Sequence, residues 1–254
     1  MKVIFMRRFL KILGALLLGI IVILGILWNV SLQQLQNLTV QHTDTPTLFI
    51  PGDDSNWTSF GPMADRFENY SLAKERMIVH VADNGHLDIK QLGPLTDNPL
   101  ILVYFDDSTH AKKEAPQLKK ILTYLHDKHN ISAVNLVSHS SGGDVCFNYL
   151  TDQPLKNVHV AKWITIADNF PDSVTNGKTL PKGLKILNIA GNISWAHGDL
   201  VVSTDEAKQL KAFAEKQGIF YQDHIFNGTI FTAYHSMLHQ NAKVDRWIAQ
   251  FLFN

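Results

Sequence analysis

Hydrophobic and polar positions alternate in blocks along the chain, and these blocks predict strands and helices in turn. Apolar runs of strand length occur at residues 47–50, 77–81, 99–105, 134–137, 161–167, 184–190 and 220–226. Residues 83–86 form a predicted hairpin turn with a short returning strand at 87–89. Helical patterns lie at residues 58–70, 112–129, 206–217 and 243–253. The alternation predicts an α/β fold with a mainly parallel sheet and helices on both faces.

The N-terminal segment differs from the rest of the chain. Residues 12–28 are an unbroken apolar run of 17 residues, at the lower end of the length that spans a bilayer. Cationic residues precede this run, which predicts a cytoplasmic N-terminus and an outer domain: Lys2, Arg7, Arg8 and Lys11. We expect a signal anchor over residues 1–29, a polar linker over 30–44 and one domain over 45–254. Cleavage of the leader would instead release the domain.

Composition narrows the classes of function. The formal net charge is zero at pH 7, which argues against a nucleic-acid partner. Hydrophobic residues make up 45% of the chain and can supply a sizeable core. Cys146 is the only cysteine, so no intramolecular disulfide can form.

A polar turn ending in two glycines separates the apolar run at 134–137 from a helix-compatible run at 145–150. Strand, sharp turn and helix form the setting that exposes a nucleophilic serine at the edge of a sheet. Residues 138–142 read Ser-His-Ser-Ser-Gly and resemble the nucleophile elbow G-x-S-x-G of the α/β-hydrolases, with Ser140 at the apex. Ser138 replaces the first glycine, and its small side chain still fits this position.

The resemblance implies partners for Ser140. In α/β-hydrolases the acid and then the histidine follow the serine along the chain, and Asp199 and His235 come in this order, each after a predicted strand. The histidine would accept the serine proton, and the aspartate would fix the histidine tautomer and stabilise its charged form. This chemistry requires no cofactor, and none is expected.

Other residues compete for the same roles. Asp168 also follows a strand and could replace Asp199, while His239 lies four residues beyond His235 and could replace that histidine. His139 flanks the elbow serine, where a side chain usually packs beside the turn. The two C-terminal histidines have i, i+4 spacing, but no glutamate or third ligand completes a metalloprotease pattern, so no metal is expected.

The resemblance also implies an oxyanion hole built from backbone amides. In α/β-hydrolases the loop after the first strand begins with His-Gly and donates one amide, whereas Pro51 and Gly52 occupy these positions here. The expected donors are the amides of Asp53 and of Ser141, the residue after the nucleophile. Backbone donors survive side-chain changes, so the proline leaves this expectation in place.

Two further segments extend the resemblance beyond the elbow. Residues 99–105 (PLILVYF) and 234–241 (YHSMLHQN), taken with the elbow, look like the DUF915 family of α/β-hydrolases. That family is found in Gram-positive bacteria, chiefly lactobacilli and relatives, and the resemblance covers roughly residues 44–254. It implies an α/β-hydrolase fold and a protein that is exported or membrane-anchored. It identifies no substrate.

We therefore expect a serine hydrolase on the outer cell surface that cleaves carboxylic esters, with a small acyl ester or a lipid-like molecule as substrate. The same side chains also suit an amidase or an acyltransferase, because pocket shape decides the leaving group and the acceptor. A non-catalytic binding module on a hydrolase scaffold is the alternative from another class, and Pro51 and Ser138 suggest it. Triad residues within hydrogen-bond reach would count against that module.

Overall fold

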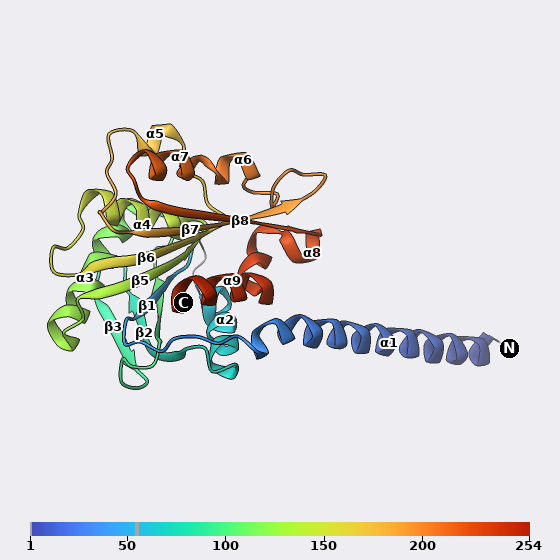
Figure 1. The fold of residues 1–254 in the computed structure, drawn as a ribbon. Coiled ribbons are helices and arrows are strands. Elements are labelled where there is room, and N and C mark those ends of the chain that lie inside the picture. Colours follow the sequence, from blue (N-terminus) through green and yellow to red (C-terminus); the bar gives the residue numbers. More distant parts are fainter. Residues whose placement is uncertain (1, 54–55) are drawn as a thin grey trace.

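The computed structural model describes residues 2–53 and 56–254, and an eight-stranded sheet forms its centre (Figure 1). The strand order is β3-β2-β4-β1-β5-β6-β7-β8, and all neighbours are parallel except the antiparallel pair β2 and β3. The strands are β1 Thr47–Ile50, β2 Lys74–Val81, β3 Leu87–Gln91, β4 Pro99–Phe105, β5 Ala133–His139, β6 His159–Ile166, β7 Lys185–Ile193 and β8 Phe220–Gly228.

The predicted α/β fold and mainly parallel sheet are confirmed. The strands β1 and β4 are buried along their whole length, as unbroken apolar strands must be when helices cover both faces of a sheet. The predicted hairpin is also present, since β3 returns antiparallel to β2 after the turn at residues 83–86. The other neighbouring strands run parallel, so the connections between them cross over the sheet. The carboxyl ends of the parallel strands therefore lie at one edge of the sheet.

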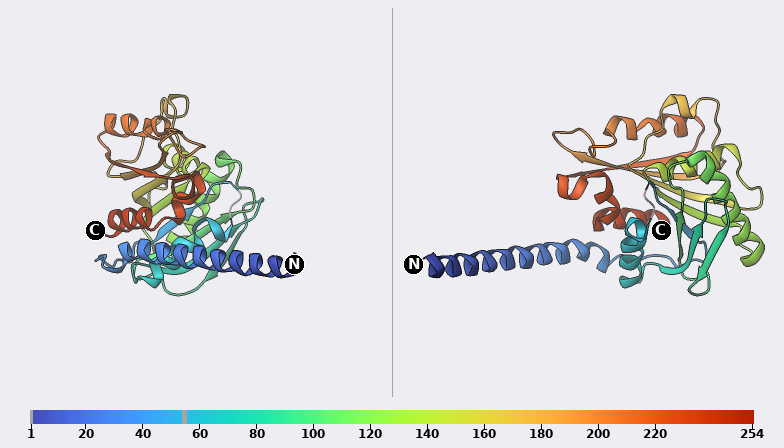
Figure 2. Two further views of the ribbon diagram at one scale, coloured as in Figure 1. Left: turned by 90° about the vertical axis from the view of Figure 1, so that its right-hand side faces the viewer. Right: turned by 180° about the vertical axis from the view of Figure 1, so that it is seen from behind.

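Helices cover both faces of this sheet (Figures 1 and 2). The helix α3 supplies Leu118, Ile121 and Leu125 to the apolar core on one face, which α4 and α7 also cover. On the other face, Phe60 and Phe67 of α2 pack in a second core together with α9. The helices are α1 Lys2–Gln36, α2 Trp57–Asn69, α3 Ala111–His129, α4 Ser141–Asp152, α5 Asp172–Thr175, α6 Thr204–Ala207, α7 Gln209–Lys216, α8 Ile230–Ala233, the 3₁₀ helix η1 His235–Gln240 and α9 Ala242–Phe253.

The expected helix at residues 206–217 is wrong in its details, because the segment contains two helices. The first, α6, ends at Ala207, and α7 begins at Gln209 after a break at Lys208. Ser203 starts α6 through a capping box with Glu206, in which each side chain bonds to the other residue's backbone amide. The segment is therefore helical as expected, but its first helix begins at Thr204, two residues before the expected start.

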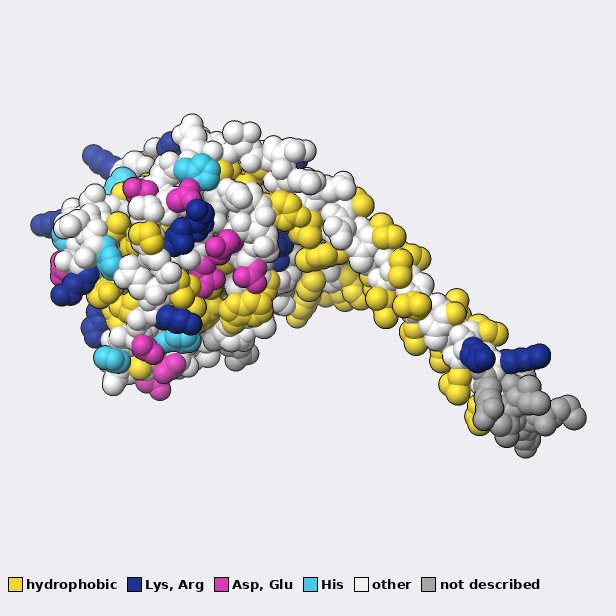
Figure 3. Space-filling view, turned by 90° about the horizontal axis from the view of Figure 1, so that it is seen from below, with side chains coloured by type: hydrophobic (Ala, Val, Ile, Leu, Met, Phe, Trp, Pro, Cys, Tyr) yellow, Lys and Arg dark blue, Asp and Glu magenta, His cyan; other side chains and the backbone are white. Residues whose placement is uncertain are grey.

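The helix α1 is continuous from Lys2 to Gln36. Within it, Arg8–Gln36 is long and apolar enough to cross a membrane, and an 18-residue window of this segment has a mean hydropathy of 2.8. Apolar side chains cover the visible surface of this projecting helix (Figure 3). It continues into the segment expected to be a linker, and there Leu35 is fully buried in the domain core while Leu32 packs against it. The domain boundaries at residues 29 and 44 stay predictions.

A buried ion pair joins α2 to α9. Arg66 Nε donates to Asp245 Oδ2 at 2.5 Å, and Arg66 Nη2 donates to Asp245 Oδ1 at 3.1 Å, so the contact is bidentate. The same Nη2 donates to the carbonyl of His239 at 3.0 Å. Because the Asp245 side chain is fully buried, each charge depends on the other for compensation. The pair thereby fixes η1 against the two helices.

Replacing Asp245 with alanine is expected to lower the free energy of unfolding by about 3–5 kcal/mol, since it leaves the Arg66 guanidinium buried without a counter-ion. Thermal or urea unfolding of the detergent-solubilised chain, followed by tryptophan fluorescence, measures this loss. The double variant Arg66→Met/Asp245→Leu removes both charges and should recover most of the stability. A double variant as unstable as the single one would contradict the buried-charge explanation.

Candidate active site

The turn between β5 and α4 holds Ser140 in an unusual backbone conformation. Its φ is 53° and its ψ is −137°, a region that residues other than glycine seldom occupy. Two backbone hydrogen bonds maintain it, because Ser140 N donates to Ile166 O at 3.0 Å and Gly143 N donates to Ser140 O at 2.8 Å. The strained turn thus lies at the carboxyl end of β5, where Ser140 lines a cavity, as expected of a nucleophile elbow.

Close backbone contacts explain the glycines on either side of this serine. A Cβ at Gly52 would lie 2.8 Å from Ser140 Cβ and 2.9 Å from the carbonyl of His139. A Cβ at Gly142 would collide with the carbonyls of Ile50 and Pro51. The loop after β1 and the first turn of α4 can approach each other only because both positions lack side chains.

Ser138, which replaces the first glycine of the elbow pattern, has polar partners of its own. It is fully buried, and its hydroxyl donates to the carbonyl of Ile164 at 3.2 Å while accepting from Trp163 Nε1 at 3.0 Å. Both partners belong to the neighbouring strand β6. The departure from glycine therefore satisfies a buried tryptophan N–H and leaves the elbow geometry in place.

Ser140, His235 and Asp199 form a hydrogen-bonded series. The distance from His235 Nε2 to Ser140 Oγ is 2.9 Å, and His235 Nδ1 lies 3.0 Å from Asp199 Oδ2. A carboxylate can only accept, so Nδ1 carries the proton and Nε2 is free to accept from the serine hydroxyl. This tautomer is the one that a general base acting on the serine requires.

The carboxylate of Asp199 is buried, and both of its oxygens accept hydrogen bonds. Its exposed fraction is 1%, and its Oδ1 accepts the amides of Val201 at 2.9 Å and Val202 at 2.7 Å. The backbone of the two loops is also joined, because His235 N donates to the Asp199 carbonyl at 3.1 Å. The loop after β7 and the helix η1 after β8 therefore hold each other in a fixed relation.

His239, the rival of His235, and His139, which flanks the serine in the sequence, lie beside His235. His139 is buried, and its Nε2 donates to the carbonyl of His235 at 3.1 Å. Its ring centroid lies 4.5 Å from that of His239. Burial lowers the pKa of His139 well below its ordinary value, and burial together with Arg66 lowers the pKa of His239 to about 4. Both imidazoles are therefore neutral near pH 7 and pack as a polar support under His235.

Asp168, the rival acid, lies elsewhere. It follows β6, and its buried side chain packs against the start of α4, so that a Cβ added at Gly143 would collide with the Asp168 carboxylate. Its Oδ1 accepts from Asn169 N at 2.8 Å. Burial, and then the charge of Asp144, raise its pKa well above the ordinary value. The structure brings Asp199, and not Asp168, to the imidazole of His235.

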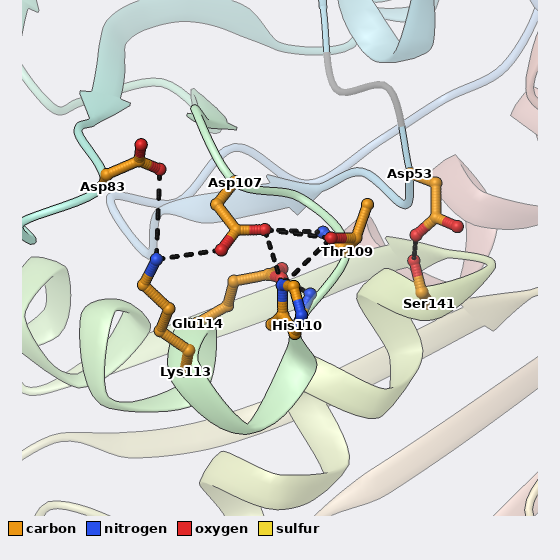
Figure 4. Close-up of polar contacts among 8 residues, drawn as sticks. All are labelled: Asp53, Asp83, Asp107, Thr109, His110, Lys113, Glu114 and Ser141. Carbon is orange, nitrogen blue, oxygen red and sulfur yellow. Dashed lines mark hydrogen bonds and ion pairs between the residues drawn. The ribbon is translucent and has the colours of Figure 1, made fainter.

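The residues expected to supply the oxyanion hole touch through their side chains. Ser141 Oγ donates to Asp53 Oδ1 at 2.6 Å (Figure 4). The contact joins the loop after β1 to the first residue of α4, and it gives the Asp53 carboxylate a partner at the rim of the site. The role of the two amides stays a prediction, and the neighbouring carboxylate, Asp54, lies outside the described residues.

A second polar group in Figure 4 braces the loop after β4. Asp107 accepts from Lys113 Nζ at 2.8 Å and from the amide of Thr109, and Lys113 with His110 holds the pKa of Asp107 well below its ordinary value. Glu114 accepts from the amide of His110 at 2.7 Å, and burial raises its pKa to about 7. These carboxylates are occupied by the start of α3, which indicates a structural role.

A cavity of about 440 Å³ is lined by Ser140 and His235. Its other walls include Gly52 and Asp53 from the loop after β1, and Val201 from the loop after β7. This volume lies within the range of small-molecule sites. Within the part of the chain that the structure describes, no three His, Cys, Asp or Glu side chains are placed to hold a metal ion.

Comparisons with known structures show where this fold occurs. The product of gene lin2722 from Listeria innocua aligns with a TM-score of 0.70 at 21% identity, covering 82% of this chain and 93% of its own. A protein from Lactobacillus plantarum, assigned as a cell surface hydrolase, gives 0.64 at 19% identity, covering 85% and 91%. The lipase BlEst2 of Bacillus licheniformis gives 0.54 at 13% identity, covering 85% and 96%. At these identities the likeness shows the α/β-hydrolase fold alone.

The family model for the alpha/beta hydrolases of unknown function called DUF915 matches residues 34–179 and 173–254. No protein with a curated description matches the chain. The family match covers the whole of the sheet, the elbow, and both loops that carry Asp199 and His235. The chain therefore belongs to the DUF915 family of α/β-hydrolases.

Proposed function

We propose that the protein is a serine hydrolase that cleaves carboxylic esters, with Ser140 as nucleophile, His235 as base and acid, and Asp199 as the orienting carboxylate. The observation that carries the proposal is the hydrogen-bonded series from Ser140 Oγ through His235 to Asp199 Oδ2. Membership of a hydrolase family and the fold shared with a lipase support the hydrolase class.

Acylation begins when Ser140 Oγ attacks the acyl carbon of the ester and its proton passes to His235 Nε2. The buried Asp199 stabilises the imidazolium that forms. As the tetrahedral intermediate collapses, the bond to the alcohol oxygen breaks and His235 returns its proton to that oxygen. The products of this step are the free alcohol and an acyl ester on Ser140.

Deacylation repeats the same transfers with water. His235 Nε2 takes a proton from the water as its oxygen attacks the acyl carbon, and the proton then passes to Ser140 Oγ as the acyl bond breaks. In both steps the amides of Asp53 and Ser141 stabilise the negative oxygen of the tetrahedral intermediate. The hydroxyl–carboxylate contact between these two residues supports this assignment, since it holds the two loops together at the cavity.

The cavity also favours an enzyme over a passive binding module. Ser140 lines an open volume and is not sealed by packing, and its hydroxyl lies within hydrogen-bond distance of an imidazole. A scaffold retained only for binding would have no need of the strained φ at this serine. Amide hydrolysis and acyl transfer use the same groups, and they differ from ester hydrolysis in leaving group and acceptor.

The helix α1 supports a membrane location for this activity. Its apolar span and the preceding cationic residues support a single-pass anchor with the domain on the outer side of the cell. Similarity to a protein assigned as a cell surface hydrolase agrees with this location. Treating intact cells with a protease tests the orientation. A domain on the outer side is cleaved, whereas a cytoplasmic domain is protected.

Ser140→Ala is expected to abolish labelling by a fluorophosphonate probe and to lower kcat on p-nitrophenyl butyrate by on the order of 10⁶-fold, because it removes the hydroxyl that lies 2.9 Å from His235 Nε2. Gel fluorescence and a spectrophotometric assay measure the two effects. Ser173→Ala, on the exposed surface of α5, is the matched control and should behave as the parent chain. Labelling that persists in Ser140→Ala would refute the proposal.

Asp199→Asn is expected to lower kcat on the same ester by on the order of 10⁴-fold with little change in KM. An asparagine can still accept the amides of Val201 and Val202, but its NH₂ group would face His235 Nδ1 and force the wrong tautomer. Steady-state kinetics checks this. The control Asp168→Asn should lower kcat far less. If Asp168→Asn lowered kcat more than Asp199→Asn does, the orienting carboxylate would be Asp168.

A further inference from the structure

Large hydrophobic side chains that stay exposed outside α1 are concentrated at one edge of the domain. Among the described residues, most of them lie on the three segments that follow β1, β7 and β8. The most exposed are Phe231 at 81%, Trp195 at 69% and Val201 at 60%. We call this group the apolar crown, and it consists of Trp57, Trp195, Leu200, Val201, Ile230 and Phe231.

The crown lies on the side of the domain toward which α1 projects. In Figure 1 the loop after β7 and the helix α8 reach out in the same direction as α1, and the view from behind in Figure 2 agrees. Among the described residues, four large exposed hydrophobic side chains of the domain lie off the crown. Tyr234 and Met237 are on the same segment after β8, whereas Leu92 follows β3 and Phe220 begins β8. Apolar exposure is therefore not scattered over the domain but faces the apolar helix.

The attachment of α1 leaves little space between this edge and a bilayer. Leu32 and Leu35 pack on the domain core, and α1 contacts α9. Toward the N-terminus, the same unbroken helix continues from Leu32 to Trp28, the last residue of the apolar run. At about 1.5 Å per residue, the four residues from Leu32 to Trp28 rise only about 6 Å. The membrane surface therefore begins close to the domain, on the crown side.

The crown is continuous with the cavity. Val201 belongs to both, since it is exposed at the surface and lines the cavity with Ser140. Its amide donates to Asp199 Oδ1 at 2.9 Å, which fastens the crown loop to the carboxylate that orients His235. A molecule that leaves the bilayer at the crown would thus meet the serine without crossing open water.

We infer that the apolar crown rests on the membrane that α1 spans, and that the site takes its substrate from that membrane: an ester-bearing amphiphile of the leaflet on the domain's side. Exposed tryptophan and phenylalanine side chains favour the interfacial zone of a bilayer, and an exposed apolar cluster beside a site marks a surface that is covered in use. The docking depends on α1 and the crown, whereas the substrate class rests on the proposed hydrolase activity.

Depth-dependent quenching tests the docking without reference to activity. Two variants of the full chain are compared: Phe231→Cys on the crown, and Leu92→Cys off the crown as the matched control. Each is labelled at the new cysteine with the fluorophore NBD and reconstituted in phosphatidylcholine–phosphatidylglycerol vesicles. The native Cys146 is fully buried, and the unsubstituted chain gives the blank. Nitroxide groups on the lipid acyl chains should quench the label at position 231 and not that at position 92. Equal quenching at both positions, or none at 231, would overturn the docking.

Turnover in the same vesicles tests the substrate class. Phe231→Asp is expected to lower hydrolysis of a fluorogenic diacylglycerol held in the bilayer by roughly tenfold or more, because the interface no longer accepts this side chain. Hydrolysis of soluble p-nitrophenyl butyrate should stay unchanged, which also shows that the variant is folded. Leu92→Asp should affect neither ester.

If Phe231→Asp lowers hydrolysis of both esters equally, or leaves hydrolysis of the vesicle-borne ester unchanged, the proposal of a membrane substrate is overturned. The proposed hydrolase activity is not affected by either result. A parent chain that hydrolyses neither ester, in a fully reconstituted state, would overturn the hydrolase and the substrate class together. Quenching at position 231 would still support the docking in that case. The two failures are therefore distinguishable.

Discussion

The buried carboxylate of Asp199 divides its two oxygens between the imidazole of His235 and the loop after β7. One oxygen fixes the histidine ring, and the other accepts the amides of Val201 and Val202. A polar group with an exposed fraction of 1% is costly to bury unless it has hydrogen-bond partners, and both oxygens of Asp199 have them. The same contacts therefore hold the charge, the ring and the loop, and none of the three can shift alone.

The polar groups beneath His235 are arranged so that the cost of burying them stays small. His139 and His239 are kept neutral by burial, so they add no positive charge beside His235. His139 donates to the backbone carbonyl of His235 and contacts its ring, and His239 packs against His139. Below them, the bidentate contact between Arg66 and Asp245 cancels two buried charges and anchors the carbonyl of His239. The segment that carries His235 is thus rigid although it is a short 3₁₀ helix and not a long element.

Local pattern predicted the strands and the elbow well, because apolar runs and turn glycines act over a few residues. The order of Ser140, Asp199 and His235 along the chain was also readable, although their catalytic role stays a prediction. What sequence could not reveal depends on residues far apart: the choice between Asp199 and Asp168 requires the fold, and the partner of Arg66 lies 179 residues away. The sequence showed that Ser138 is small enough for the elbow, but its hydrogen bond from Trp163 Nε1 depends on how β5 and β6 pair.

The direction in which the site faces follows from helix packing. A flexible linker after the apolar segment would let the domain tumble, and its exposed aromatic side chains would then meet water as often as lipid. Here the helix is unbroken and enters the core through Leu35, and Gln41 N donates to Phe253 O at 2.8 Å at the end of α9. In the proposed docking, this helix would be fixed at one end in the core and at the other in the bilayer, and it would set the tilt of the sheet so that its carboxyl edge faces the membrane surface. Phe231 and Trp195 are exposed and bury little area on folding, and the proposed docking would give them an apolar environment.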